Sequence, residues 1–271
     1  MVFEFRLIMS LLTASDFSGG FERPLLWSPT KGSVGATLLQ DKRAVLAERL
    51  RLIAVSHSRV RLASSLSAED QVLADIILTE LKNTGNQNID IFTLETGRLH
   101  QETLALLEQV KQRYGYEIKL YRPEAGQVAK YVNTYGLNGF YDSLEARKKC
   151  CQIRKIVPLD QALSQADAWI TGQRREQSVT RTELALQEQD TARNILKYNP
   201  LFDWSEAEIW AYVDLYDLPV NVLHDQGYPS IGCEPCTKAV RAGEDPRAGR
   251  WWWESQDSKE CGLHVSPAPT A

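Results

Sequence analysis

Hydrophobic and polar residues follow two alternating patterns along most of the chain. Short runs rich in β-branched and aromatic residues predict strands at residues 59–64, 89–94, 117–121 and 168–171. Between them, apolar residues recur at helical spacing and predict amphipathic helices over residues 68–81, 101–114 and 128–135. A further helical pattern begins near Leu39, and another follows Ser205.

Strands that alternate with helices predict an α/β fold, a mostly parallel sheet with helices on both faces. Such a sheet binds its ligands at the carboxyl ends of its strands. Those ends carry Ser64 and Ser65 after the first predicted strand, residues 95–98 after the second and residues 171–175 after the fourth. Hydroxyls, glycines and arginines at this edge suit a phosphorylated ligand.

The two ends of the chain differ from this pattern. Residues 7–14 are apolar enough to imitate a signal peptide, but Glu4 precedes them and residues 15–17 form a poor cleavage region. We therefore expect residues 1–38 to be a poorly ordered leader. From Gly227 onward the sequence is loop-like.

Composition and charge argue against two classes of protein. The 271 residues are 43% hydrophobic and 24% charged, as in an ordinary globular protein. The formal net charge of -4 argues against a general nucleic-acid binder, which would carry a basic surplus. No apolar run approaches the roughly 20 residues that span a bilayer, so no membrane partner is expected. The sequence leaves the oligomeric state open, a homo-oligomer included.

The five cysteines are the most informative residues. An odd number cannot all pair within one chain, and the natural partition is four in one site and one left to react. This partition suits a reducing cytoplasm, where disulfides are rare, and predicts a cytoplasmic protein. Four of them lie in two groups, the adjacent pair Cys150 and Cys151 and the C-x-x-C of Cys233 and Cys236.

Thiolates at C-x-x-C spacing can reach one metal centre. Adjacent cysteines on a helix point about 100° apart, which hinders a single-zinc tetrahedron but lets each bind a separate iron of an iron–sulfur cluster. On this chemistry alone, an iron–sulfur cluster, a zinc site and a structural or disulfide role carry equal weight.

Cys261 is the candidate nucleophile. The thiolate is the reactive form, and Lys259 and His264 nearby favour it. The alternative is a frayed terminal cysteine without a role. A disordered tail normally lacks aromatic residues, however, and Trp251–Trp253 lead into this segment.

Basic residues accompany these candidates. Arginine and lysine bind phosphate or sulfate oxygens, although each one alone could be a solvated surface charge. They are Lys148, Lys149, Arg154 and Lys155 around the first cysteine pair, Arg174, Arg175 and Arg181 after the fourth predicted strand, and Arg247 and Arg250 before Cys261. Residues 64–70 join a strand to a helix, where backbone amides can hold an anion, but they lack the pattern of a nucleotide triphosphatase.

Together these motifs resemble the assimilatory adenylyl-sulfate reductases of bacteria, relatives of the phosphoadenylyl-sulfate reductases, from about Leu39 to His264. The motifs are residues 94–100 (LETGRLH), 149–155 (KCCQIRK), 171–178 (TGQRREQS), 197–201 (KYNPL), 231–237 (IGCEPCT), 249–254 (GRWWWE) and 259–264 (KECGLH). One departure is Ser67, where the family usually has glycine.

The resemblance implies an adenine nucleotide α-hydrolase-like fold, with a nucleotide- and cluster-binding domain over residues 39–240 and an arginine/tryptophan segment with a catalytic tail over residues 241–271. It implies a [4Fe–4S] cluster on Cys150, Cys151, Cys233 and Cys236. Adenylyl sulfate is the implied substrate, because phosphoadenylyl-sulfate enzymes generally lack these four cysteines. The implied substrate-binding residues are Ser64, Ser65, Lys155, Arg174, Arg247, Arg250 and His264.

The implied reaction is thiol chemistry in two halves. The Cys261 thiolate attacks the sulfate sulfur and AMP leaves; thioredoxin then releases sulfite from the S-sulfocysteine. Three alternatives remain at this point. They are a phosphoadenylyl-sulfate or dual-substrate reductase, an adenylating ligase or sulfurtransferase, whose Ser-Gly-Gly-x-Asp-Ser loop is absent, and a zinc-stabilised binding module.

Overall fold

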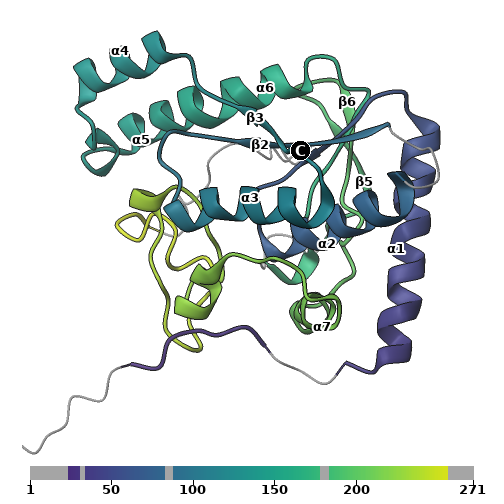
Figure 1. The fold of residues 1–271 in the computed structure, drawn as a ribbon. Coiled ribbons are helices and arrows are strands. Elements are labelled where there is room, and N and C mark those ends of the chain that lie inside the picture. The colour runs from purple at the N-terminus through teal and green to yellow at the C-terminus, as the bar shows by residue number, and fades with distance from the viewer. Residues whose placement is uncertain (1–23, 31–33, 83–87, 178–182, 256–271) are drawn as a thin grey trace, which may run out of the picture.

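The computed structural model describes residues 24–30, 34–82, 88–177 and 183–255, and its elements are labelled in Figure 1. The strands are β1 (Val60–Ala63), β2 (Ile89–Leu94), β3 (Lys119–Tyr121), β4 (Ala168–Ile170), β5 (Gln187–Asp190) and β6 (Ile195–Tyr198). The helices are α1 (Ala36–Ser56), α2 (Ala68–Ile76), α3 (Gln101–Tyr114), α4 (Ala125–Tyr135), α5 (Leu144–Cys151), α6 (Val157–Leu163) and α7 (Glu206–Tyr216). Two π-helical turns extend α2 and join α5 to α6, namely η1 (Ile77–Leu81) and η4 (Gln152–Ile156).

The strands form one sheet in the order β3-β2-β1-β4-β6-β5. All neighbours are parallel except β5, which runs antiparallel to β6. The chain moves outward from β1 to β3 and then returns to β4 on the other side of β1. A ligand crevice forms outside the carboxyl ends of the strands at such a reversal. The prediction of a mostly parallel sheet with helices on both faces is confirmed.

The helices cover both faces of the sheet, which Figure 1 shows edge-on. α4, α5 and α6 lie on one face, and α2, α3 and α7 lie on the other. The larger core fills the second side and includes Leu62 and Val72, whereas Phe92, Leu159 and Trp169 belong to a smaller core on the first side. Burial of each such side chain contributes roughly 1.5–3 kcal/mol to the free energy of folding. The two cores therefore hold in place the strand ends, where the site lies.

Two parts of the fold differ from the sequence-based expectation. The pattern does not predict the β5–β6 hairpin, because Gln187–Asp190 contains no apolar residue. An edge strand of this kind needs only one hydrogen-bonded neighbour, and polar residues protect it from further pairing. The helical stretch over residues 144–163 was not predicted either, because its first turns carry charged residues and cysteines instead of an amphipathic repeat.

Part of the expected leader packs on the domain. The backbone N–H of Trp27 donates to the carbonyl of Val240 at 3.0 Å, and its ring lies 6.4 Å from that of Trp210. The first helix begins at Ala36, slightly before the expected position. The described residues 24–30 therefore contribute to the structure around the C-terminal segment.

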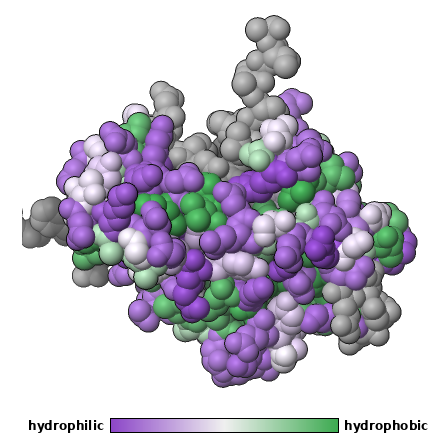
Figure 2. Space-filling model, turned by 90° about the horizontal axis from the view of Figure 1, so that it is seen from above, coloured by the Kyte–Doolittle hydropathy of each residue, from purple (hydrophilic) through white to green (hydrophobic). Residues whose placement is uncertain are grey.

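The outer surface is mostly polar. Seen from the side of α4–α6, hydrophilic residues dominate and leave separate hydrophobic areas between them (Figure 2). Exposed large apolar side chains such as Val55, Leu137 and Leu215 are spread over different elements, as is normal for a globular protein. Among the described helices, none has the length and apolar character needed to cross a membrane.

Candidate active site

One cavity of about 300 Å³ lies at the carboxyl ends of β1, β2 and β4. Its volume is in the range of small-molecule sites. Most of the substrate-binding residues expected from the sequence line it, namely Ser64, Ser65, Lys155, Arg174, Arg247 and Arg250. Cys261 and His264 lie outside the residues that the structure describes.

The loop between β1 and α2 forms one wall of this cavity. The backbone N–H and the hydroxyl of Ser65 donate to Asp70 Oδ2 at 2.6 and 2.8 Å. Leu66 has a φ of 63° and is buried, so the loop bends sharply there. Burial raises the pKa of Asp70 to about 6, although the Ser65 hydrogen bonds oppose this shift. Asp70 thus holds the backbone and hydroxyl donors of Ser65 in place at the N-terminus of α2, a position where anions bind in many proteins.

Ser67, the departure from the family pattern, is the N-cap of α2. Its hydroxyl accepts from the backbone N–H of Asp70, and the Asp70 carboxylate accepts from the backbone N–H of Ser67, both at 3.4 Å. Its φ of -71° is an ordinary value for any residue. The serine therefore caps the helix and imposes no strain on the loop.

The loop after β4 approaches this wall closely. A Cβ atom added to Gly172 would lie 2.5 Å from Asp70 Oδ1 and 3.0 Å from Glu69 Cβ. A side chain at this position would separate the two loops. Gly172 therefore allows the carboxyl ends of β1 and β4 to close one cavity.

At another wall of the cavity, the guanidinium of Arg250 packs against Gly232. It is 8% exposed, its Nη1 donates to Ser230 Oγ at 3.3 Å, and its guanidinium lies 5.0 Å from the Trp251 ring centroid. A Cβ atom on Gly232 would lie only 2.4 Å from Arg250 Nη2. The absence of a side chain at Gly232 thus permits this arginine orientation.

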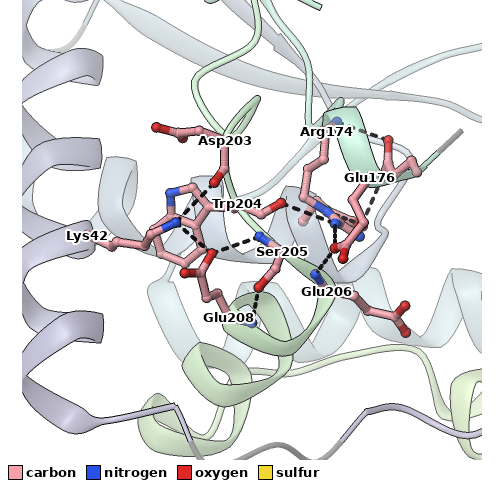
Figure 3. A network of polar contacts seen from close by, with 10 residues as sticks. Lys42, Arg174, Glu176, Asp203, Trp204, Ser205, Glu206 and Glu208 are labelled. Carbon is pink, nitrogen blue, oxygen red and sulfur yellow. Dashed lines mark hydrogen bonds and ion pairs between the residues drawn. The ribbon is translucent and has the colours of Figure 1, made fainter. Parts of the chain in front are cut away.

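Arg174 is engaged by carboxylates and a carbonyl. It pairs with Glu69 at 2.9 Å and Glu176 at 3.2 Å, and its Nη1 donates to the carbonyl of Trp204. Figure 3 shows this network between the β4 loop and the start of α7, where Glu206 N donates to Glu176. Burial opposes ionisation of Glu69, but Arg174 outweighs it and lowers the pKa of that carboxyl. The arginine therefore holds two loops together at the cavity wall.

The four described cysteines gather beside the cavity. Cys151, Cys233 and Cys236 are buried in one cluster with Phe140 and Trp251, and Cys150 packs against it. The loop after β2 holds the C-x-x-C segment, because Thr96 Oγ1 lies 3.3 Å from Cys233 Sγ and Glu234 N donates to the carbonyl of Arg98. Cys233 also lines the cavity.

The chemistry of this donor set fits a soft metal or cluster. Burial and the neighbouring Cys233 raise the pKa of Cys236 to about 12. Buried thiolates need nearby positive charge, which a bound metal or cluster would supply. Burial also raises the pKa of Cys150. The positive charge of Arg154 opposes this shift at Cys150, and that of Lys155 opposes the shift at Cys236. Within the described residues, no group of three or more potential ligands is arranged as a metal site. The cysteines lie together as expected, and the [4Fe–4S] cluster remains a prediction.

A buried ion pair joins the first cysteine pair to the C-terminal segment. Arg147 on α5 is fully buried and makes two hydrogen bonds of 2.8 Å to the Glu254 carboxylate. Its guanidinium also lies 4.6 Å from the Trp251 ring centroid and interacts with Cys151. This contact fixes the chain at the last described residues before Cys261.

Removing the charge of Glu254 is expected to destabilise the protein. The Glu254→Gln substitution leaves Arg147 buried without its counter-charge, which lowers the free energy of unfolding by about 3 kcal/mol. The exposed pair of Glu48 and Arg51 provides a control, and Glu48→Gln should leave the urea unfolding curve unchanged. Coincident unfolding curves for Glu254→Gln and the parent would refute the stabilising role of the pair.

For several lining residues, the sequence does not show what the side chain or its absence contributes to the cavity. Gly172 and Gly232 matter because of what faces them across the cavity, which spacing along the chain does not reveal. Thr96 lies in a recognised motif, and its position directly after β2 is the signal that could have identified it. Trp27 comes from a segment expected to be disordered, so nothing in the sequence indicates it.

The fold and cavity define an α/β protein whose cavity lies at the strand-order reversal, beside the N-terminus of α2. Residues 59–239 match the family model of the phosphoadenosine phosphosulfate reductase domain, and the chain belongs to this family. It is 56% identical over 235 residues to a protein of Burkholderia cepacia named adenosine 5'-phosphosulfate reductase, covering 85% of this chain and 92% of that one. A protein of the same name from Neisseria meningitidis serogroup B is 54% identical over 244 residues, covering 89% and 97%.

Solved structures support the fold assignment. A phosphoadenylyl-sulfate reductase from Candida auris, solved with phosphate, superposes with a TM-score of 0.61 at 21% identity, covering 77% of this chain and all of that one. Yeast FAD synthetase superposes with a TM-score of 0.54 at 12% identity, covering 77% of this chain and 70% of that one. The expected adenine nucleotide α-hydrolase-like fold is thereby confirmed.

Proposed function

We propose that this chain reduces adenylyl sulfate to sulfite and AMP in sulfate assimilation, with Cys261 as the nucleophile and thioredoxin as the electron donor. The observation that carries the proposal is one cavity that joins the loop between β1 and α2, four lysine and arginine side chains and the cysteine cluster. The relatives named adenosine 5'-phosphosulfate reductase support the choice of substrate. A reactive thiol of this kind suits the reducing cytoplasm.

In the first half-reaction, the Cys261 thiolate attacks the sulfate sulfur and forms an S–S bond. The bond from this sulfur to the bridging oxygen breaks, and its electron pair leaves with AMP. The loop of Ser64 and Ser65 holds the phosphate, while Lys155, Arg247 and Arg250 bind the sulfate and stabilise the growing charge on the leaving oxygen. Arg174 positions the adjoining loop through Glu69.

In the second half-reaction, a thioredoxin thiolate attacks Cys261 Sγ and sulfite leaves with the electron pair of the S–S bond. The second thioredoxin thiol resolves the mixed disulfide. Thioredoxin is thus oxidised to its disulfide, sulfate sulfur is reduced to the level of sulfite, and Cys261 returns to its thiol form. Glu254 anchors the segment before Cys261, and a chain of that length spans at most roughly 25 Å.

Cys150, Cys151, Cys233 and Cys236 would hold a [4Fe–4S] cluster beside this cavity. When bound, the cluster would supply a structural and electrostatic element, and thioredoxin would supply both electrons. The support for this assignment is the buried all-sulfur donor set and the cations Arg147, Arg154 and Lys155 around it. Iron and sulfide analysis of anaerobically purified protein tests it, and zinc with no iron would contradict it.

Sulfite release from adenylyl sulfate, with thioredoxin and its reductase, tests the proposed function. The expected result is turnover of adenylyl sulfate well above that of phosphoadenylyl sulfate at equal concentration. Faster release from phosphoadenylyl sulfate would favour the alternative reductase. ATP hydrolysis without sulfite release would favour an adenylating enzyme.

The orientation of Arg250 gives a separate prediction. Gly232→Ala places a methyl group against the guanidinium, so kcat/KM for adenylyl sulfate should fall by roughly tenfold or more. Gly35→Ala is the control, because a Cβ atom at Gly35 has no neighbour within 4 Å. Equal kinetics for the two variants would show that Gly232 does not position Arg250.

A further inference from the structure

A second group of side chains lines the cavity around the start of α7. Trp27, Trp210 and His224 bring their rings together, with centroids 5.0 Å apart for Trp210 and His224 and 6.2 Å apart for Trp27 and His224. Glu69 and Glu206 line the cavity beside them. Of these residues, the proposed reaction uses only Glu69, which pairs with Arg174, and it assigns no role to the three rings or to Glu206.

His224 presents an acceptor to this part of the cavity. The residue is 4% exposed, and its Nδ1 lies 2.7 Å from the carbonyl oxygen of Tyr228. Because a carbonyl only accepts, Nδ1 carries the proton, and burial lowers the pKa of His224, which keeps the ring neutral. Nε2 is then a lone-pair acceptor, and it is buried with no partner among the described residues.

Glu206 adds a second acceptor. Its Oε1 is buried and has no hydrogen-bond partner among the described residues. Figure 3 shows its side chain pointing away from Glu176 and Arg174. Burial raises the pKa of Glu206 and the charges of Glu176 and Glu69 add to this shift, whereas Arg174 and a hydrogen bond with Trp210 oppose it. Since Arg174 already pairs with Glu69 and Glu176, this region has a surplus of negative charge.

Two buried acceptors in an acidic setting call for a ligand that donates hydrogen bonds and carries no negative charge. In a nucleotide whose 5'-phosphate occupies the loop at Ser65, the sugar is only a few bonds away. Glu69, in the first turn of α2, lines the same cavity. Ribose hydroxyls are such donors, and carboxylates commonly bind them in dinucleotide sites. A phosphate on the sugar would instead bring an acceptor-only dianion towards two carboxylates.

We infer that His224 and Glu206 form a subsite for the ribose hydroxyls and that this subsite selects nucleotides with a free 3'-hydroxyl over those with a 3'-phosphate. The inference rests on the proposed function and names two specificity-determining residues for it. The negative charge around this subsite would favour adenylyl sulfate over phosphoadenylyl sulfate, and this preference would not depend on the cysteine cluster.

Isothermal titration of the holoenzyme with AMP and with adenosine 3',5'-bisphosphate tests this inference without any turnover. The parent should bind AMP more tightly. Glu206→Gln should reduce the preference for AMP by roughly tenfold, because it removes a nearby like charge. Asp214→Asn is the control, since Asp214 is exposed on the same helix and does not line the cavity.

A second variant tests the histidine. His224→Phe removes the acceptor but keeps a ring, so it should weaken AMP binding several-fold and leave 3'-deoxy-AMP binding unchanged. An unchanged preference in Glu206→Gln, or equal losses for AMP and 3'-deoxy-AMP in His224→Phe, would overturn the subsite. Failure of the parent to release sulfite would refute the proposed function but would leave these binding results to decide the subsite.

Discussion

Cys261→Ser is expected to lower sulfite release from adenylyl sulfate by roughly a thousandfold or more, because a serine hydroxyl is not ionised at neutral pH and cannot form the S-sulfo intermediate. The measurement is steady-state sulfite release with saturating thioredoxin. AMP affinity should remain within error of the parent, since the residues that line the cavity are unchanged.

AMP binding in the same variant is the control for folding. If Cys261→Ser binds AMP normally and still releases sulfite at the parent's rate, another group must be the nucleophile. Loss of AMP binding together with activity would instead point to a structural role for this cysteine.

Arg250→Ala is expected to have the next largest effect. In the proposed mechanism this buried arginine binds the transferred sulfate, and its removal should lower kcat/KM by roughly a hundredfold to a thousandfold. Arg250→Lys should retain part of the activity, because it keeps the charge but loses the planar fork. Stopped assays over a range of adenylyl sulfate concentrations separate the effect on kcat from that on KM.

Arg51→Ala provides the matched control for this prediction. Arg51 lies on α1 with its side chain half-exposed and paired to Glu48, and it does not line the cavity. Its kinetics should equal those of the parent. A normal kcat/KM in Arg250→Ala would remove this arginine from the proposed mechanism.

Local pattern was sufficient to predict β1 to β4, but not β6, which is also part of the parallel sheet. The expected bounds of β2 and α3 agree with the structure, because both segments have a clear period and α3 ends at Gly115. β5 could not be predicted in this way, because all four of its residues are polar and its neighbour in the sheet is β6 alone. An edge strand of this type is defined by tertiary contacts and leaves little trace in the hydrophobic pattern.

The sequence predicted which residues gather at the candidate site better than it predicted what each of them does there. Basic residues and cysteines gather as expected because they follow strand ends or adjoin the cysteine motifs. Arg174 was expected to bind substrate, yet its side chain is held by Glu69 and Glu176, which the sequence spacing does not indicate. Direct contact between Arg174 and substrate remains a prediction. The contributions of Trp27 and Gly232 depend on long-range packing alone.

Mass spectrometry of the protein after incubation with adenylyl sulfate, in the absence of any reductant, tests the central claim most directly. The account predicts that the peptide with Cys261 gains the mass of one SO₃ group and loses it when reduced thioredoxin is added, with release of sulfite. An SO₃ group on any other residue, or turnover of the enzyme with no modified peptide, would contradict the account.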